Sequence, residues 1–381
     1  MQILIELLLL LASALIMGRI AERLKVPAVV GQIIAGMLLG PAVLHLVAIN
    51  VTLSSVAEIS LFFIMLLVGV GMTVDTLANH VKSAVLFSLS AFVIPMFIMF
   101  MVAYEAFGLG MGQALITSIA IGVPSISIIS VLVMRYRLLR KEDGKRIIAS
   151  VVLTDVIAFI VLAMIGRGVG SGIGATLSMI VFIIALFLID AFVRKHENGV
   201  KRFFSRVSSM DNGDSVIFGM IILIGLFVAT LTQLAGITYV LGAFFAGLLI
   251  HEAVLGKSIY KSLNRTLERV GEAFFIPLFF SIAGLQAALP TMGNIPLLLT
   301  LVAISGLIGG SLNYLVGKNR LKELKPLAAS AFLGGRGAVG IIIANIALLE
   351  GIIGINLYSV IISGTVILSL TLPALLKSSG L

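Results

Sequence analysis

The sequence has no cysteine, and only four of its 381 residues are histidine. Without cysteine, the chain forms neither disulfides nor thiolate metal sites. The histidines are scattered and show no paired spacing of metal ligands. Charged residues are scarce too, at 11% of the chain, whereas a soluble domain carries roughly 25%. The shortage of charge excludes an ordinary soluble protein and indicates a polytopic membrane protein.

Hydrophobic residues make up 60% of the chain, whose length suits about a dozen membrane spans with short loops. The net charge of +9 comes from basic residues in those loops, where the positive-inside rule accounts for them. We therefore expect no nucleic-acid partner. Segment 1–18 lacks the basic residues that open a signal peptide and carries Glu6 instead, so we expect it to be retained as the first span.

The fold class that we expect is an all-α polytopic membrane protein with 13 transmembrane helices. Apolar segments alternate with charged or Gly- and Pro-rich breaks along the whole chain, and each segment suits one crossing of the bilayer. The expected spans are residues 2–20, 27–46, 56–77, 82–107, 110–134, 146–166, 173–193, 215–235, 237–253, 268–289, 294–317, 326–349 and 354–376.

The basic residues test this count, because cytoplasmic loops are enriched in lysine and arginine. Of the 26 basic residues, 24 follow an odd-numbered span. The exceptions are Arg167, which follows span six, and Arg336, which lies within span twelve. The alternation predicts an integral protein of the cell (plasma or inner) membrane, with its N-terminus outside and its C-terminus in the cytoplasm.

The chain contains an internal repeat. Residues 26–40 align without gaps on 237–251, and residues 62–64 align on 274–276 at nearly the same offset. The identical pairs are Val29/Val240, Gly31/Gly242, Ala35/Ala246, Gly36/Gly247 and Leu38/Leu249. The aligned spans are seven apart, so the two copies cross in opposite directions, which is typical of secondary transporters. We expect inverted repeats over approximately 1–166 and 215–376, joined by span seven.

Two spans should be interrupted near their centres. Span five contains Pro124 between glycine and serine residues, and proline breaks the helical hydrogen-bond ladder. The repeat places the run 333–338 of span twelve opposite, so that Arg336 maps onto Ser125. We expect spans five and twelve to cross at their breaks, where half-helix ends carry about half an elementary charge each.

Asp155 is the charged residue of the apolar run between Arg146 and Arg167. A charge near the bilayer centre costs at least ~2.5–3.5 kcal/mol, so an ionisable residue there is a candidate functional site. At the crossing, Asp155 can neutralise the positive half-helix ends, and Arg336 the negative ones. The pattern predicts that Asp155 binds a cation.

Several motifs, in their order and spacing, resemble the monovalent cation/proton antiporters. They are VPAVVGQIIAGMLLGP, GVGMTVD, GITYVLGAFFAGLL, the interrupted span five, Thr-Asp in span six and GGRGAV in span twelve. The resemblance covers essentially the whole chain. It implies a homodimer with two parts, an ion-binding core (82–166 and 294–376) and a scaffold or dimerisation part (1–77 and 173–289).

The resemblance also implies roles for individual residues. Asp155 resembles the essential ion-binding carboxylate, and Thr154 occupies the position that is aspartate in electrogenic members. Arg336 resembles the arginine of the second interrupted helix. Ser125 and the carbonyls around Val123 and Pro124 resemble the neighbouring polar ligands, while Gly335 and Gly337 flank Arg336 in the break. Span eleven lacks the lysine of the electrogenic members.

These observations predict an antiporter that exchanges Na⁺, or alternatively K⁺ or Li⁺, for H⁺. A buried carboxylate has a raised pKa, so Asp155 can bind a proton and a cation alternately. One carboxylate that swaps one cation for one proton moves no net charge, so electroneutral 1:1 exchange is expected. No cofactor and no enzymatic activity are expected.

Four other interpretations are open. The first is a sodium-coupled symporter of a small organic anion, in which Arg336 would contact the solute. A channel lacks the repeated TVGYG-type filter, and an intramembrane aspartyl protease lacks a second acid near midspan. In the fourth interpretation, Asp155 only forms an ion pair with Arg336 that fixes the packing of the helices, and it has no role in transport.

Overall fold

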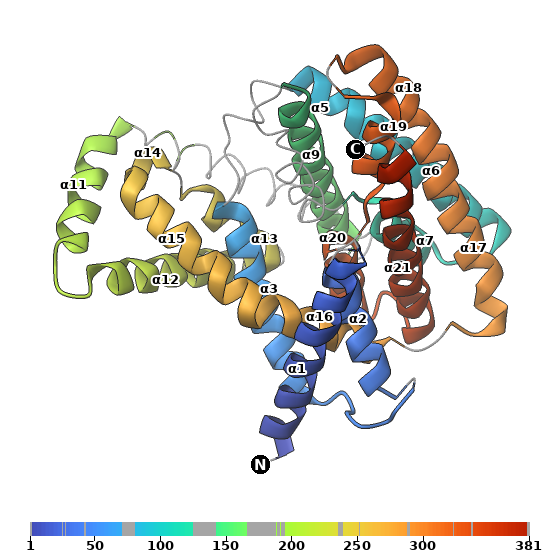
Figure 1. Ribbon diagram of the computed structural model, residues 1–381, viewed down its shortest axis with the longest axis horizontal. Helices are drawn as coiled ribbons and strands as arrows, with labels where there is room; N and C mark the ends of the chain where they lie inside the picture. The colour runs from blue at the N-terminus through green and yellow to red at the C-terminus, as the bar shows by residue number, and fades with distance from the viewer. Residues whose placement is uncertain are drawn as a thin grey trace. The chain divides into compact units, whose positions relative to one another are not determined.

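The computed structural model is nearly all helical (Figure 1). The chain divides into two compact units: the first comprises Met1–Ser54, Asp75–Leu162 and Phe280–Leu381, and the second comprises Ser55–Val74 and Ala163–Phe279. The structure describes residues 2–24, 26, 28–41, 43–70, 81–124, 142–165, 188, 191, 195–234, 239–250, 252–287, 290–322, 324–336 and 338–378.

The first unit holds most of the helices. They are α1 (Gln2–Arg23), α2 (Ala28–Leu39), α5 (Val81–Ser88), η1 (Leu89–Val93), α6 (Ile94–Met101), η2 (Val102–Ala106), α7 (Met111–Gly122), α9 (Glu142–Ile165), η6 (Met292–Asn294), α17 (Ile295–Ala303), η7 (Ile304–Gly309), α18 (Gly310–Arg320), α19 (Pro326–Gly334), α20 (Ala338–Leu349) and α21 (Ile355–Ser378). The segments η1, η2 and η7 are π-helical and lie inside longer helices.

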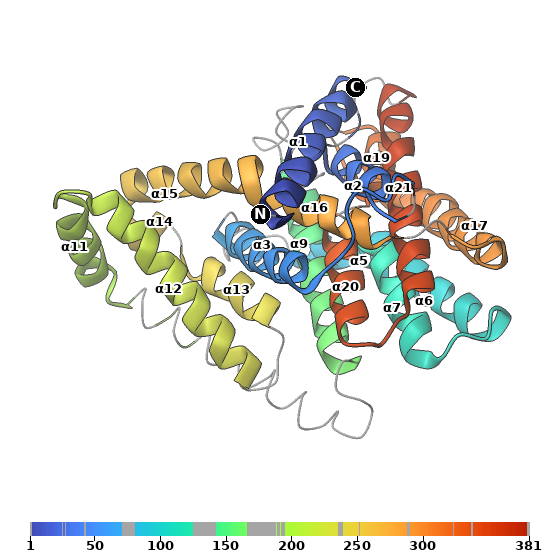
Figure 2. The same cartoon turned by 90° about the horizontal axis from the view of Figure 1, so that it is seen from below.

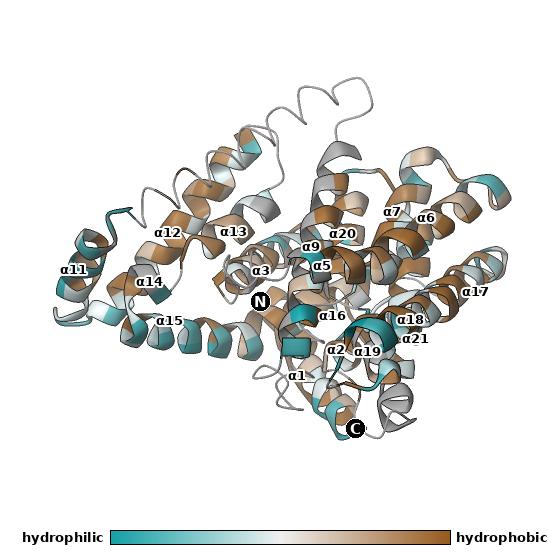
Figure 3. Ribbon diagram, turned by 90° about the horizontal axis from the view of Figure 1, so that it is seen from above, coloured by the Kyte–Doolittle hydropathy of each residue, from teal (hydrophilic) through white to brown (hydrophobic). Residues whose placement is uncertain are grey.

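The second unit contains most of α3 (Val51–Val70) and the helices of the middle of the chain. These are α11 (Glu197–Ser208), α12 (Gly213–Leu234), α13 (Tyr239–Leu248), α14 (Glu252–Leu255), α15 (Lys257–Val270) and η5 (Gly271–Phe275). Helix α16 (Ile276–Gln286) follows η5 and belongs to the second unit up to Phe279 and to the first unit from Phe280. Helix α15 is amphipathic: Leu263 and Leu267 are buried, while Lys261 and Arg265 are exposed. Figure 3 shows hydrophilic residues along α11 and α15 and apolar residues along α12.

Four described helices are long and apolar enough to cross a membrane: Ile3–Arg23, Ala84–Ala106, Gly213–Leu234 and Met292–Arg320. Shorter apolar helices accompany them, among them Met111–Gly122 and Ile355–Thr371. The prediction of a helical membrane protein is thereby confirmed. The count of thirteen spans stays a prediction, and the expected span 173–193 lies almost wholly outside the described residues.

Glycines bring helix backbones into direct contact in both units. In the first unit, a Cβ added to Gly36 of α2 would lie 1.8 Å from the carbonyl oxygen of Ser281 in α16. In the second unit, a Cβ added to Gly247 of α13 would lie 2.4 Å from the carbonyl oxygen of Leu66 in α3. Small residues permit such close approach in membrane helices, so these positions exclude any side chain.

A second pair of glycines makes contacts of the same kind. A Cβ on Gly31 of α2 would lie 2.2 Å from the carbonyl oxygen of Met17 in α1. A Cβ on Gly242 of α13 would lie 2.6 Å from the Cα atom of Ala229 in α12. In both α2 and α13, one glycine therefore contacts the preceding long helix, and the glycine five positions later contacts a different helix.

Candidate functional site

Helix α9 carries the predicted ion-binding residues. It spans Glu142–Ile165 and so covers most of the expected span 146–166. Thr154 is fully buried, and its Oγ1 donates a hydrogen bond of 2.7 Å to the carbonyl oxygen of Val151 one turn earlier. The backbone of Asp155 belongs to this helix, while its side chain lies outside the described residues.

The first predicted break follows α7. This helix ends at Gly122, and Val123 adopts an extended conformation with φ −71° and ψ 126°. The N–H of Val123 still donates to the carbonyl oxygen of Ile119 at 2.9 Å, and both Val123 and Pro124 are buried. Proline cannot continue the helix, which explains why α7 stops here. Ser125 lies outside the described residues.

The second break lies between α19 and α20. Helix α19 ends at Gly334, and the next helix begins at Ala338. Gly335 and Arg336 lie between them in non-helical conformations and are buried, whereas Gly337 lies outside the described residues. The break thus falls at the run of glycines that flanks the arginine.

The two breaks meet. Pro124 and Arg336 form an isolated antiparallel β-bridge. Next to the bridge, α7 and α20 are in close contact, because a Cβ added to Gly340 would lie 2.0 Å from the carbonyl oxygen of Ala120. Helices α7, α20 and α21 pack side by side (Figures 1 and 2). The structure therefore brings Val123, Pro124, Gly335 and Arg336 together in one unit.

Arg336 is the largest fully buried side chain described. Its guanidinium donates to three oxygens: Nε to Ser305 Oγ at 3.2 Å, Nη1 to the carbonyl of Leu333 at 3.3 Å and Nη2 to the carbonyl of Ala91 at 3.2 Å. Ser369 donates through Oγ to the main-chain carbonyl oxygen of Arg336. Neutral acceptors surround the charge, and one of them belongs to the last turn of α19.

Two of these partners come from π-helical segments. Ala91 lies in η1 and Ser305 in η7. A π-helical turn disturbs the regular hydrogen-bond ladder, and such turns occur frequently at functional sites. Sequence reasoning missed both partners. A main-chain carbonyl leaves no sequence signature, and a serine within an apolar run is only a weak signal.

A buried polar pair lies beside this cluster. Ser90, the neighbour of Ala91, donates through Oγ to Oδ1 of Asn313 at 3.1 Å. Asn313 belongs to α18 and is fully buried, and its Nδ2 atom has no hydrogen-bond partner among the described residues. Sequence reasoning singled out neither residue, although asparagine in a long apolar helix is a visible signal.

Helix α9 is apolar and carries an aspartate near its middle, and it follows the break at Pro124, which meets the break at Arg336. This arrangement is typical of membrane transporters for ions. A family model described as "Sodium/hydrogen exchanger, transmembrane" matches residues 9–378. The chain belongs to this family of transporters. The family match gives no support to the symporter interpretation.

Similar proteins span the whole chain. The Na⁺/H⁺ antiporter of Enterococcus hirae is 26% identical over 97% of this chain and 96% of its own length. The Na⁺/H⁺-K⁺ antiporter GerN of Bacillus cereus is 24% identical over 98% and 95%. The fold matches that of MjNhaP1, a sodium proton antiporter from Methanocaldococcus jannaschii, with a TM-score of 0.73, 17% identity and coverage of 98% and 97%.

Proposed function

We propose that this protein exchanges Na⁺ for H⁺ across the membrane, with Asp155 binding the cation and the proton alternately. The observation that carries the proposal is the family match over residues 9–378. The Enterococcus hirae and Bacillus cereus relatives are both named as antiporters of Na⁺ and H⁺. Asp155 is the charged residue in the apolar part of α9, so it is the group that can hold either ion there.

The hydroxyl of Thr154 suits a cation ligand. Its hydrogen is committed to the carbonyl oxygen of Val151, so a lone pair of Oγ1 is free to face a positive ion. Hard cations prefer oxygen ligands. In the proposal, Thr154, Ser125 and the carbonyls of Val123 and Pro124 complete the shell around a cation held by Asp155.

Arg336 has a structural role in this proposal. It balances the partial negative charge at the end of α19, which its bond to the carbonyl of Leu333 supports. Its bonds to Ala91 and Ser305 tie the break to two further helices, so Pro124 and Gly335 are held in place around the site. Arg336 therefore compensates charge and fixes geometry, without binding the transported ion.

We also propose 13 transmembrane helices in two inverted repeats, with interrupted helices crossing at the bridge. The glycine contacts support the repeat. Gly36 and Gly247, which the repeat aligns, each press against the backbone of another helix, as do the aligned Gly31 and Gly242. The same residue type thus makes the same kind of contact at equivalent positions of both copies, which chance recurrence of small residues does not explain.

The proposed topology places the N-terminus outside and the C-terminus in the cytoplasm of the cell membrane. Arg146 Nη1 donates to the carbonyl oxygen of Arg320 at 3.1 Å, so the basic segments after spans five and eleven meet. This contact supports the assignment of both segments to one side. The core (82–166 and 294–376), the scaffold (1–77 and 173–289) and a homodimer belong to the same proposal, and light scattering of the purified detergent complex tests the dimer.

The test is ion exchange in proteoliposomes. Vesicles with an acidic interior and a pH-sensitive dye report proton efflux when NaCl, KCl or LiCl is added outside. We expect dequenching with NaCl for the wild type and none for Asp155→Asn. Asp211→Asn, which removes an exposed carboxylate at the turn before α12, is the matched control and should behave as wild type. Full exchange by Asp155→Asn would refute the assignment of the site.

A further inference from the structure

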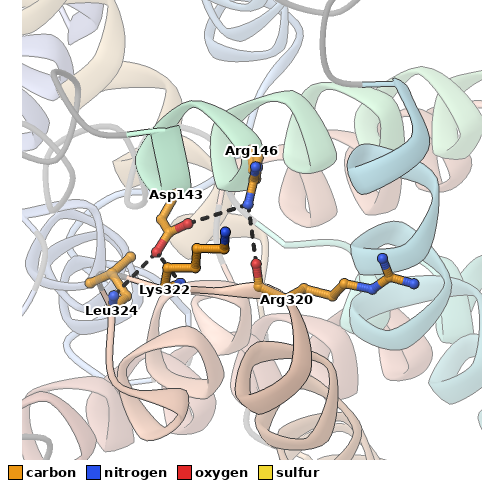
Figure 4. A network of polar contacts seen from close by, with 5 residues as sticks. All are labelled: Asp143, Arg146, Arg320, Lys322 and Leu324. Atoms are coloured by element: carbon orange, nitrogen blue, oxygen red, sulfur yellow. Dashed lines mark hydrogen bonds and ion pairs between the residues drawn. The ribbon is translucent and has the colours of Figure 1, made fainter.

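The first turn of α9 carries a buried carboxylate that the transport site does not use. Asp143 is 2% exposed. Its Oδ2 accepts hydrogen bonds from the backbone N–H groups of Lys322, at 2.9 Å, and Leu324, at 3.2 Å (Figure 4). Its Oδ1 lies 3.5 Å from Nη1 of Arg146. Both N–H groups belong to the loop 321–325, which connects α18 to α19.

Arg146 extends this contact by one more bond. Its Nη1 also donates to the carbonyl oxygen of Arg320, the last residue of α18, at 3.1 Å. Figure 4 shows the Asp143 carboxylate and the Arg146 guanidinium pointing toward the same loop. We call the group formed by Asp143, Arg146, the carbonyl of Arg320 and the N–H groups of Lys322 and Leu324 the α9–loop clamp.

Elementary electrostatics favours the clamp. Asp143 lies at the N-terminus of α9, where the helix dipole stabilises negative charge. Arg146 contacts the C-terminal end of α18, where the dipole of α18 stabilises positive charge. Bonds in which one partner is ionised are roughly twice as strong as neutral ones. Backbone N–H groups in a loop have no helical acceptor, and the carboxylate of Asp143 accepts the hydrogen bonds of Lys322 and Leu324 instead.

The clamp joins the two elements that carry the transport site. Asp155 lies twelve residues after Asp143 on α9, which is about 18 Å along a helix. The clamped loop leads directly into α19, which ends at Gly334 just before Arg336. The N-terminal end of α9 is thus tied to the loop that begins α19. Asp155 lies near the middle of α9, and Arg336 lies just past the far end of α19.

We propose that Asp143 and Arg146 are positioning residues for cation exchange. The clamp keeps the axial position of α9 relative to α19 constant throughout the transport cycle. It thereby determines the position of Asp155 relative to the break at Arg336. The inference rests on the proposed function, because it assigns the clamp to the site at Asp155. A small axial slip of α9 would misplace the cation ligands that it carries while leaving the fold intact.

The first test separates positioning from folding. Exchange rates are measured against Na⁺ concentration for wild type, Asp143→Asn, Arg146→Gln and the double variant, each normalised to the amount of reconstituted protein. We expect the apparent KM for Na⁺ to rise about three- to tenfold in each single variant. The double variant should show no more than the larger single effect, since both residues act in one clamp.

Arg320→Gln is the matched control. It removes a positive charge next to the clamp but keeps the main-chain carbonyl that Arg146 uses, and Figure 4 shows its guanidinium pointing away from the clamp. Its KM should equal that of wild type. A lower maximal rate with unchanged KM in the clamp variants would show a merely structural role. An equal rise of KM in Arg320→Gln would show a general effect of charge. Either result overturns the proposal.

The second test replaces the clamp by a covalent bond. Because the chain has no cysteine, the double variant Asp143→Cys/Leu324→Cys contains a single pair of thiols. Reduced, it should show the raised KM of Asp143→Cys alone; oxidised to the disulfide, its KM should return toward wild type. An oxidised protein that stops exchanging, or that keeps the raised KM, overturns the proposal.

Wild type and Asp155→Asn run beside every series. Absence of Na⁺-driven exchange in wild type would refute the proposed function itself. Exchange in wild type that Asp155→Asn abolishes, with unchanged KM in the clamp variants, would refute only the positioning role. The two failures are therefore distinguishable.

Discussion

Pro124 and Arg336 form an antiparallel β-bridge between the ends of two interrupted helical segments. In an apolar environment, backbone that leaves a helix needs new hydrogen-bond partners, and non-helical backbone is tolerated where it is buried in protein. The bridge brings the two irregular segments together, and the Arg336 side chain satisfies the carbonyls of Leu333 and Ala91 beside it. The energetics of the break therefore depend strongly on this arginine.

Replacing Arg336 should destabilise the protein. Arg336→Ala leaves the Leu333 and Ala91 carbonyls and the Ser305 hydroxyl without their donor in a buried site, and unsatisfied buried groups cost about 1–3 kcal/mol each. The fraction of protein that stays monodisperse after heating, read by size-exclusion chromatography, measures the loss. Arg19→Ala is the control: it breaks an exposed ion pair with Glu22, and such pairs contribute about 0–1 kcal/mol. Equal losses in both variants would contradict this account.

The sequence was sufficient to locate the breaks but not the partners of Arg336. Proline and glycine act on the backbone locally, so Pro124 and the glycines around Arg336 predicted helix ends near Gly122 and Gly334. The acceptors of the guanidinium are a carbonyl in η1 and a serine in η7, and a π-helical turn depends on packing that no single residue type announces.

The same distinction applies to the glycines and to the clamp. The repeat identified Gly36 and Gly247 as special positions, but only the fold shows which helix each one touches. Nothing in the sequence singles out Asp143, because its partners are backbone N–H groups, which every loop possesses. The pattern of basic residues marks Arg146 only as a topology signal, although it also bonds to the end of α18.

Gly36 should tolerate no side chain. In Gly36→Ala the new Cβ meets the Ser281 carbonyl oxygen at 1.8 Å, so α2 and α16 must separate, and overpacking of this kind costs typically about 1–3 kcal/mol. Gly219→Ala in α12 is the control, because a Cβ there meets nothing within 4 Å and alanine is the better helix former. We expect a lower melting temperature for Gly36→Ala and an equal or higher one for Gly219→Ala. The reverse order would show that the α2–α16 contact is looser than described.

Tyr260 should make stability depend on alkaline pH. Its hydroxyl donates to the carbonyl oxygen of Val70 at 2.7 Å, and burial, with Glu252 and Glu268 adding to it, raises the pKa of Tyr260 above 10.0. Because the folded pKa exceeds the unfolded one, the stabilisation is complete below pH 10 and is lost as pH rises through the folded pKa. Near neutral pH, the free energy of unfolding of wild type should exceed that of Tyr260→Phe by about 0.5–1.5 kcal/mol. In melting curves above pH 10, this difference should disappear. A difference that does not change with pH would contradict the prediction.

The hydroxyl of Thr154 should contribute to cation binding. Thr154→Val keeps the shape of the side chain and removes its oxygen, so the apparent KM for Na⁺ should rise about tenfold, equivalent to roughly 1.4 kcal/mol. Thr154→Ser restores the oxygen and should recover most of the affinity. Equal KM values for the valine and serine variants would show that Thr154 serves packing alone.

Exchange should not respond to membrane potential. In the proposed mechanism, Thr154 replaces a second carboxylate and one proton leaves Asp155 for each Na⁺ that binds, so that no net charge would cross the membrane. If one net charge moved per cycle, 100 mV would add about 2.3 kcal/mol, which corresponds to roughly a fifty-fold shift in the ion gradients at equilibrium. Proteoliposomes clamped at 0 and at −100 mV with K⁺ and valinomycin separate these cases. At both potentials, dye fluorescence should stay constant when the Na⁺ ratio, inside over outside, equals the proton ratio taken in the same direction. A run without Na⁺ checks that the protein itself carries no K⁺. A large displacement at −100 mV would show that a further charge moves with Asp155.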